Sequence, residues 1–442
     1  MRSLVRSMAR IAVAGLALRG RTSEHEGARI PADQVPLALR AFWIDGFFAA
    51  AQDAFILAYL PLLASALGAN ALEIGLLSAS MSLGALLALY PGAIAARRAR
   101  SRRWVVVFYA GILGRLALLG SVFAVAFLHG QVALYAVIAL FTLRAFLGNY
   151  TLPAWTALAA DIIPVRLRAR YFASRNFATQ MALLAVTPLG GLLLDYAGFP
   201  GGYVAALAVS FALGMVSTVA FARIPEPRAH RQETRSPVGL GTIFRNRRFR
   251  NFVAATFALH LATMIAGPFF NVYLKNNIGA TNFEVGWLTT SSSVMGLLGQ
   301  LVCGELQHRR GALWLTRVAL LVLPTLPLMW LFVSAPWMVL APNLVGGFMW
   351  SAFNLSNFQL LLEVTPEEGR EEYAAAFHAS VFTALFIAPF IGGLIIDTLG
   401  YRPAFFISGV GRLVSTALFF MVVAGARPRL LSTTETVESA AR

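Results

Sequence analysis

Charged side chains interrupt several long apolar stretches of this sequence, and they are the residues that could do chemistry. Asp45, Asp53, Arg144 and His260 each lie inside a run of predominantly apolar residues. In a membrane, each such ionisable group costs roughly 2.5–3.5 kcal/mol on insertion scales. These side chains are therefore expected to pair with one another or to face water rather than lipid. Arg144 has two candidate partners, Asp45 and Asp53.

A carboxyl group beside an arginine can carry a proton, because desolvation and the neighbouring cation act on its charge in opposite directions. We predict that Asp45 or Asp53 binds and releases a proton and that Arg144 sets its pKa. His260 is a second candidate, although a single histidine in an apolar helix is more often a hydrogen-bonded structural residue.

Polar and aromatic side chains recur along four of the apolar stretches at spacings of about four and three residues, which place them on one helical face. Such faces predict the wall of a wet cavity. Its candidate residues are Gln52, Arg144, Tyr150, Trp155, His260, Asn271, Trp350, Asn354 and Asn357. The arginine favours an anionic or zwitterionic ligand, whereas the aromatic rings equally suit a sugar or an amphipathic drug.

Residue patterns of common enzymes are missing from the sequence. It contains no His-x-x-x-His pair, no glycine-rich phosphate loop and no nucleophile elbow. Its single cysteine, Cys303, excludes a disulfide scaffold and a cysteine-based metal site. We therefore expect no catalytic residues, no metal site and no cofactor.

The elements that hold these residues follow from the composition. The sequence is 58% apolar and 13% charged, whereas a soluble domain averages about 45–50% and about 25%. A helix of about 20 apolar residues crosses a bilayer. Twelve such stretches occur, at residues 37–66, 72–95, 104–128, 132–159, 171–194, 202–223, 251–274, 284–303, 312–333, 337–361, 373–395 and 403–424. Their continuous apolar character favours helices over barrel strands and predicts an all-α integral membrane protein.

The distribution of basic residues predicts the orientation of these spans. The formal net charge is +16, and every basic residue except Lys275 is an arginine. Most arginines precede the first span, follow the last, or lie in connections on that same side, whereas Lys275 and Arg402 lie on the other side. This positive-inside pattern places both termini in the cytoplasm and assigns the charge to membrane lipid rather than nucleic acid. The compact loops and the scarcity of lysine predict a bacterial inner (plasma) membrane.

The two halves of the sequence match each other. The segment that starts at Asp161, DIIPVRLRARYFA, matches EVTPEEGREEYAA, which starts at Glu363. At the same offset, GGLLLDYAGF at 190–199 matches GGLIIDTLGY at 392–401. Internal repeats of this kind indicate that one structural unit occurs twice.

An earlier match, between residues 68–77 and 279–288, shows that each half holds six spans in the same order. Parallel repeats of this kind predict two pseudo-symmetric six-helix bundles. The predicted organisation is a cytoplasmic N-terminal segment (1–36), an N-terminal bundle (37–223), a cytoplasmic linker (224–250), a C-terminal bundle (251–424) and a cytoplasmic tail (425–442).

A motif of the form carboxylate-x-x-Pro-x-x-x-Arg stands after the fourth and the tenth spans. It consists of Asp161, Pro164 and Arg168 in the first half and of Glu363, Pro366 and Arg370 in the second. With the six-plus-six repeat and the basic central linker, it resembles the major facilitator superfamily over residues 37–424. The resemblance implies a secondary transporter that moves a small solute by alternating access, usually as a monomer.

The motif has a physical reason. Proline ends the helix, so the carboxylate and the arginine lie at the cytoplasmic mouth and can pair when that mouth closes. Exposed pairs contribute about 0–1 kcal/mol each, so several of them bias an equilibrium without locking it. We predict a cytoplasmic gate formed by Arg97, Asp161, Arg168, Arg309, Glu363 and Arg370. The aspartate-containing motif usual after the second span is degraded, with Ala96 and His308 in the places of the aspartates.

The resemblance also implies that spans 1, 4, 7 and 10, which carry the polar faces, line a substrate cavity between the halves. It makes the third span peripheral, so Arg115 is expected to be structural. The segments at 187–191 and 388–393 are similar to a motif of proton antiporters, but close packing through small residues explains them better. Proton-coupled transport is the leading prediction, and an uncoupled facilitator and a non-transporting membrane sensor are the alternatives. The substrate, the direction and the coupling ion stay open.

Overall fold

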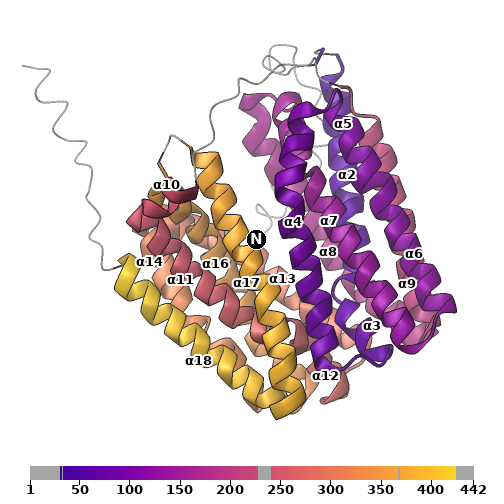
Figure 1. Cartoon of the computed structure of the whole chain (residues 1–442), viewed down its shortest axis with the longest axis vertical. Coiled ribbons are helices and arrows are strands. Elements are labelled where there is room, and N and C mark those ends of the chain that lie inside the picture. Colours follow the sequence, from indigo (N-terminus) through magenta and orange to yellow (C-terminus); the bar gives the residue numbers. More distant parts are fainter. Residues whose placement is uncertain (1–29, 32, 227–239, 367–368, 425–442) are drawn as a thin grey trace, which may run out of the picture.

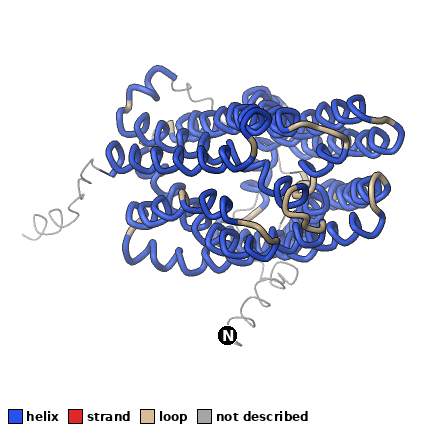
Figure 2. Tube along the Cα trace, turned by 90° about the horizontal axis from the view of Figure 1, so that it is seen from below, coloured by secondary structure: helices blue, strands red, loops and turns tan. Residues whose placement is uncertain are grey.

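The computed structural model describes residues 30–31, 33–226, 240–366 and 369–424, and most of them are helical. Helices and short connections make up these residues, and none of them forms a strand (Figure 2). The predicted all-α fold class is confirmed. Most of the predicted N-terminal segment, about half of the linker and all of the tail lie outside the described residues.

Each predicted span of the first half corresponds to a helix or to a series of short helices. The first span is broken near Ala58, and the third contains a wide helical segment, η2. The elements are α2 (Val35–Ile56), α3 (Leu60–Ala66), α4 (Ala71–Arg98), α5 (Arg102–Val105), η2 (Val106–Leu113), α6 (Gly114–Phe127), α7 (Gly130–Ile162), η3 (Val165–Leu167), α8 (Arg168–Ala197) and α9 (Gly201–Ala222).

The second half repeats this order, including the break in its first span. Its elements are α10 (Leu240–Arg245), α11 (Arg247–Ala266), η4 (Gly267–Phe269), α12 (Phe270–Asn276), α13 (Asn282–Arg310), α14 (Ala312–Val322), α15 (Thr325–Met329), η5 (Trp330–Phe332), η6 (Pro336–Val339), α16 (Leu340–Val364), α17 (Arg370–Leu399), α18 (Tyr401–Phe419) and η7 (Phe420–Ala424).

Eleven helical stretches in the described part of the chain are long and apolar enough to cross a membrane. The remaining predicted span is α13, which has 29 residues but carries consecutive hydroxyl side chains at 289–293 that lower its hydropathy. Helix α13 packs along α8 and α16 as a full member of the bundle. The predicted twelve-helix architecture is therefore confirmed, with one span more polar than the others.

Helices α4 and α13 begin with the same local structure. The Asn70 side chain accepts a hydrogen bond from the backbone N–H of Glu73, whose carboxylate accepts one from the N–H of Asn70. Thr281 and Glu284 form the same reciprocal pair at the start of α13. Such capping boxes satisfy donors that a helix N-terminus otherwise leaves free. They explain why the two halves match at these positions.

The two halves meet where α4 packs on α17 and α8 packs on α13. They approach each other at the end that carries α3 and α12, called here the closed end (Figure 1). They diverge toward the end that carries α5 and α10, called here the open end. At the closed end the backbones touch, because a Cβ on Gly393 would lie 2.6 Å from the carbonyl oxygen of Ala71. The close packing predicted for 388–393 is thus observed.

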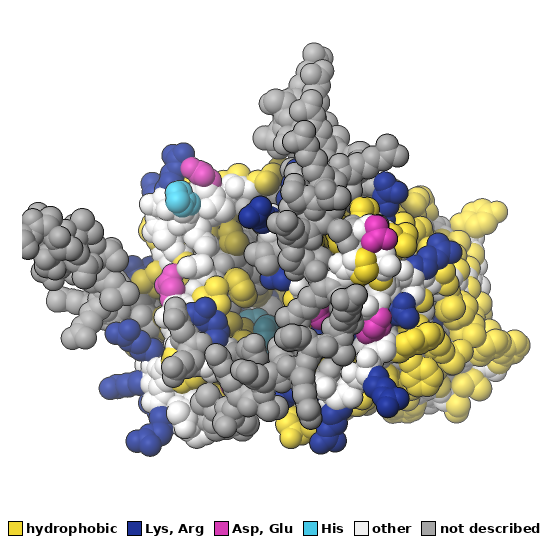
Figure 3. Space-filling model, turned by 90° about the horizontal axis from the view of Figure 1, so that it is seen from above, with side chains coloured by type: hydrophobic (Ala, Val, Ile, Leu, Met, Phe, Trp, Pro, Cys, Tyr) yellow, Lys and Arg dark blue, Asp and Glu magenta, His cyan; other side chains and the backbone are white. Residues whose placement is uncertain are grey.

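The open end is basic. Viewed onto this end, Figure 3 shows basic side chains around the rim, while hydrophobic side chains cover much of the flank. The basic side chains come from helix ends and connections at Arg97, Arg98, Arg102, Arg103, Arg166, Arg168, Arg170, Arg245, Arg247, Arg248, Arg250, Arg309, Arg310 and Arg370. The charge asymmetry seen in the sequence is therefore an asymmetry between the two ends of the fold.

Candidate functional site

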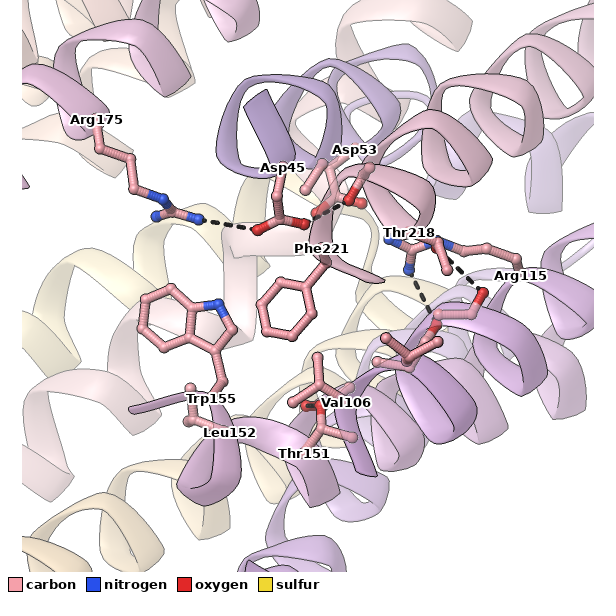
Figure 4. A pocket seen from close by; sticks show the side chains of 16 residues that line it. Asp45, Asp53, Val106, Arg115, Thr151, Leu152, Trp155, Arg175, Thr218 and Phe221 are labelled. Atoms are coloured by element: carbon pink, nitrogen blue, oxygen red, sulfur yellow. Dashed lines mark hydrogen bonds and ion pairs between the residues drawn. The ribbon is translucent and has the colours of Figure 1, made fainter. Parts of the chain in front are cut away.

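A cavity of about 410 Å³ lies inside the N-terminal half, among α2, η2, α6, α7, α8 and α9. Helix α2 packs closely on α8 and α9 and stands away from α7, which leaves this space between them. Charged side chains line it, namely Asp45, Asp53, Arg115 and Arg175. The two carboxylates lie between Arg175 on one side and Arg115 on the other (Figure 4).

Asp45 is buried and is held by two helices at once. The Ser217 hydroxyl of α9 donates a hydrogen bond to its Oδ1 at 2.7 Å, and Nη2 of Arg175 on α8 lies 3.5 Å from its Oδ2. The guanidinium group of Arg175 also lies over the rings of Phe42 and Trp155, at 4.9 and 5.1 Å from their centroids. A buried carboxylate needs such partners. Arg175 and Ser217 therefore offset the desolvation cost of an ionised Asp45.

Asp53, two turns further along α2, pairs with Arg144 of α7. Its Oδ1 accepts hydrogen bonds from Nη2 of Arg144 and, at 3.0 Å, from Nε2 of Gln52. The Asp53 side chain is 37% exposed, so this carboxylate is accessible to water, whereas that of Arg144 is 13% exposed. Of the two pairings that the sequence left open, the structure forms Arg144 with Asp53.

Arg115, on α6, has no carboxylate of its own within hydrogen-bond reach among the described residues. Its Nη1 donates to the carbonyl oxygen of Ala110 at 3.2 Å, and its Nε has no partner. The buried Oε1 of Gln52 also lacks a donor. The Nε atom of Arg115 and the Oε1 atom of Gln52 both face Gly214 of α9, and a Cβ at Gly214 would collide with them. The sequence interpretation set Arg115 apart on a peripheral span, but the structure places it in the cavity wall.

The C-terminal half lacks counterparts of Arg175, of Arg144 and of the two carboxylates of α2. In α17, which matches α8 in length and register, Phe377 occupies the place of Arg175. Its ring stacks on Phe252 with centroids 5.7 Å apart. Helix α11 contains no acidic residue, and α16 contains no arginine. Because the same bundle forms around aromatic rings, the fold alone does not require the charged set.

The other predicted cavity residues of the first three cavity helices lie in different surroundings. Trp155 lines the cavity of the N-terminal half. Tyr150 packs on Tyr109 with ring centroids 4.7 Å apart. Asn271 lies at the closed end, where its Nδ2 donates to the carbonyl oxygen of Ala58 across the two halves at 3.2 Å. Asn271 therefore joins the halves in this conformation.

The predicted cavity residues His260, Trp350, Asn354 and Asn357 belong to α11 and α16. The Nδ1 of His260 lies 2.9 Å from the carbonyl oxygen of its own helix at Thr256. Asn354 is exposed, whereas Asn357 is buried and its Oδ1 has no partner among the described residues. The structure does not bring these four residues to the charged cavity, so the predicted site divides into a charged part in the first half and a neutral part in the second.

The six predicted gate residues lie at the open end. Asp161 pairs with Arg102 of its own half at 2.7 Å. Arg97 and Arg370 are exposed. The remaining contacts run from Arg168 to the carbonyl oxygens of Ala160 and Ile163, from Arg309 to Glu305 and from Gln359 to Glu363, each within one half.

Two carboxylates join the halves at the closed end in a symmetric manner. Asp195, near the end of α8, accepts hydrogen bonds from the backbone N–H groups of Asn282 and Phe283, at 3.0 and 2.8 Å. Asp397, near the end of α17, accepts bonds from the N–H groups of Ala71 and Leu72, both at 2.9 Å. Each aspartate therefore caps the first turn of a helix that belongs to the other half. We call these two contacts the aspartate caps.

Sequence reasoning missed Arg175, Ser217 and the aspartate caps. Arg175 was visible as an ionisable residue within a predicted span, at a place where the matching half has Phe377. Asp195 and Asp397 were visible as a carboxylate shared by the two copies of one repeat. A carboxylate kept in both copies is a signal for a structural contact that both halves make.

The charged set suits protons or anions better than metal ions. No group of three or more His, Cys, Asp and Glu side chains in the described part of the chain is placed to hold a metal. The two carboxylates of the cavity stand among three guanidinium groups, whose positive charge opposes the binding of a cation. The chemistry that this arrangement favours is exchange of a proton or recognition of an anionic group.

The sequence model of the Major Facilitator Superfamily matches the chain twice, at residues 42–263 and 252–441. These two matches cover both halves that the structure shows. The chain therefore belongs to the Major Facilitator Superfamily, a family of membrane transporters.

Comparisons with individual proteins agree with this assignment. An uncharacterized MFS-type transporter of Methanocaldococcus jannaschii is 23% identical over 166 residues, which are 38% of this chain and 43% of that protein. The solved structure of the nucleoside transporter NupG superposes on this chain with a TM-score of 0.71 at 16% sequence identity. The match covers 88% of this chain and 100% of the NupG chain. A bacterial homologue of the iron transporter ferroportin, in an inward-facing state, has a TM-score of 0.71 at 15% identity, covering 87% and 98%. At such identities the likeness concerns the fold.

Proposed function

We propose that this membrane transporter is a secondary transporter, which moves a small solute by alternating access and couples the movement to protons. The charged set of the N-terminal half carries the proposal, because the matching half forms the same bundle without such a set. A carboxyl group that exchanges an arginine partner for a proton changes the charge of the cavity. Such a change can link proton binding to solute binding.

The titrating group is Asp45 or Asp53. The groups that face Asp45 are Arg175, Ser217, Arg115 and Tyr171. Those that face Asp53 are Arg144, Gln52 and Arg115. Asp53 is the more exposed to water and Asp45 the more enclosed, so a proton that enters at Asp53 could pass on to Asp45.

The basic open end is assigned to the cytoplasm by the positive-inside rule. The closed end, with its aspartate caps, then faces the outside, and the structure corresponds to an inward-open state. The transporter acts as a monomer in a bacterial inner membrane, with lipid around its apolar flank. It needs no cofactor in this scheme, and the solute itself is the ligand.

Neutralising each carboxylate tests the proton coupling. In proteoliposomes with a trapped pH dye, addition of a solute library is expected to identify a solute that moves protons through the wild type. Asp45→Asn and Asp53→Asn should lower gradient-driven uptake of that solute to the level of empty liposomes, because neither amide can carry a proton. Exchange of labelled solute in the absence of a gradient should continue.

Glu226→Gln is the matched control, since it removes a carboxylate that lies outside the spans and contacts Ser101 and Arg103. Gradient-driven uptake that survives both aspartate changes would contradict the coupling. Solute flux without any proton movement in the wild type would favour the uncoupled facilitator. Solute binding without flux would favour the membrane sensor.

The cytoplasmic gate is a separate part of the proposal. When the open end closes, Asp161, Arg168, Glu363, Arg370, Arg97 and Arg309 are expected to pair across it. Exposed pairs contribute about 0–1 kcal/mol each, so the double change Asp161→Asn with Glu363→Gln should slow transport by a few-fold. Transport rates in proteoliposomes measure this, and an unchanged rate would mean that these are ordinary helix-end charges.

A further inference from the structure

The charges of the N-terminal cavity do not balance. Arg175 pairs with Asp45, and Arg144 pairs with Asp53. Arg115 is the third guanidinium group of the set, and its described hydrogen bond goes to the neutral carbonyl group of Ala110. With both carboxylates ionised the cavity carries one positive charge in excess, and protonation of either carboxyl group raises the excess to two.

Two buried hydrogen-bonding atoms beside the cavity also lack partners. The buried Nε of Arg115 has no acceptor, and the neighbouring Oε1 of Gln52 has no donor. A buried polar group without a partner costs free energy. Gly214 leaves the space in which both atoms lie, since a side chain there would collide with them. Arg115 also lines the cavity of about 410 Å³. The site therefore offers a donor with a positive charge beside an open volume.

We propose that this cavity binds the anionic group of the transported solute, a carboxylate or a phosphate, through the guanidinium group of Arg115. The planar fork of an arginine suits the two oxygens of such a group. The anion would balance the excess charge and accept hydrogen bonds from the guanidinium group, which lines the cavity. This inference rests on the proposed transport function and adds the chemical class of the solute.

Arg412 is a natural control within the same molecule. It is 2% exposed, its Nη1 donates to the carbonyl oxygen of Leu323 at 3.1 Å, and its Nε has no partner either. It lies on α18 in the C-terminal half, outside the charged cavity. A substitution at Arg412 therefore reproduces the loss of a buried arginine without touching the anion site.

Thermal unfolding of the full-length protein in detergent measures binding before the solute is known. Cys303 is the single cysteine and is buried, so a thiol-reactive fluorogenic dye reports unfolding directly. The probes are succinate, inorganic phosphate and glucose 6-phosphate, with succinamide and glucose as neutral counterparts and sodium chloride to equalise ionic strength. A ligand that binds the folded state raises the unfolding midpoint as its concentration increases.

At least one anionic probe is expected to raise the midpoint of the wild type, and the neutral probes are not. Arg115→Gln should need at least about tenfold more of that probe for the same shift. Arg115→Lys should fall between the two, because it keeps the charge and loses the fork. Arg412→Gln should respond to the probe as the wild type does, even if its own midpoint is lower. Whether succinate or the phosphates act distinguishes a carboxylate from a phosphate.

Three results would overturn the inference. They are an equal response of Arg115→Gln and the wild type, equal stabilisation by neutral and anionic probes, and no response of the wild type to any anion. Proton movement driven by a neutral solute and abolished by Asp45→Asn or Asp53→Asn would overturn the anion class while leaving proton-coupled transport intact. The two proposals can therefore fail separately.

Discussion

The double change Asp45→Ala with Arg175→Phe is expected to give a protein as stable as the wild type that no longer couples transport to protons. The change Arg175→Phe copies the C-terminal half, where Phe377 stands in the place of Arg175 and stacks on Phe252. The change Asp45→Ala removes the carboxylate, as in α11, which has no acidic residue. The new ring would lie beside Trp155, over which the guanidinium group now lies. Replacing a buried ion pair by apolar side chains is often neutral or stabilising.

The single change Arg175→Ala is expected to behave differently. It leaves the buried carboxylate of Asp45 with Ser217 as its hydrogen-bond partner. Loss of one partner of a buried pair costs about 3–5 kcal/mol, because the other charge stays desolvated. The 3.5 Å separation of Arg175 Nη2 and Asp45 Oδ2 favours the lower end of that range.

Unfolding midpoints, read from the exposure of Cys303, and proton flux in proteoliposomes together test this prediction. The expected order of stability places the double variant at or above the wild type and Arg175→Ala well below both. A double variant as unstable as Arg175→Ala would mean that the charged pair is needed for the fold. A stable double variant that still couples solute to protons would leave Asp53 as the proton carrier.

The spans were predictable from the sequence because burial in a membrane leaves a local signal, a long apolar run with breaks at its ends. Short stretches of consecutive residues also contain the capping glutamates Glu73 and Glu284 and the matches between the two halves. Helix α13 was predicted in the same way, although its hydroxyl side chains make it more polar than the other spans. Local patterns thus sufficed for the fold class.

The members of the charged site were only partly predictable. Asp45, Asp53 and Arg144 stand out because ionisable residues are costly in apolar stretches. Their partners do not, because the pairing of Asp45 with Arg175 depends on α2 packing on α8 and standing away from α7. The place of Arg115 in the cavity wall was not predictable for the same reason, since it is set by tertiary packing.

The double change Asp195→Asn with Asp397→Asn is expected to open the closed end. Each aspartate accepts two backbone N–H bonds from a helix of the other half. Hydrogen bonds to a charged group contribute roughly 1.5–3 kcal/mol, and an asparagine keeps a weaker neutral acceptor. Loss of the two charges should therefore cost the closed end about 3 kcal/mol, which is a shift of more than about a hundredfold in its population relative to the open form.

Spin labels measure this shift. Ala66→Cys and Asn277→Cys lie at exposed positions next to the contact between Ser65 and Asn276 that joins the halves at this end. In a Cys303→Ala background, the distance between these labels is expected to be short and narrow, and to lengthen in the aspartate double variant. Labels at the open end should approach each other at the same time.

Glu284→Gln is the matched control, because Glu284 caps the same helix α13 as Asp195 but does so from within its own half. Loss of this cap weakens the start of α13 in both conformations, so the label distance should stay short. If Glu284→Gln opened the end as far as the aspartate changes do, helix stability and not the contact between halves would control the closed state. An unchanged distance in the double aspartate variant would assign the closure to the glycine contacts, where the backbones of α4 and α17 and of α8 and α13 touch directly.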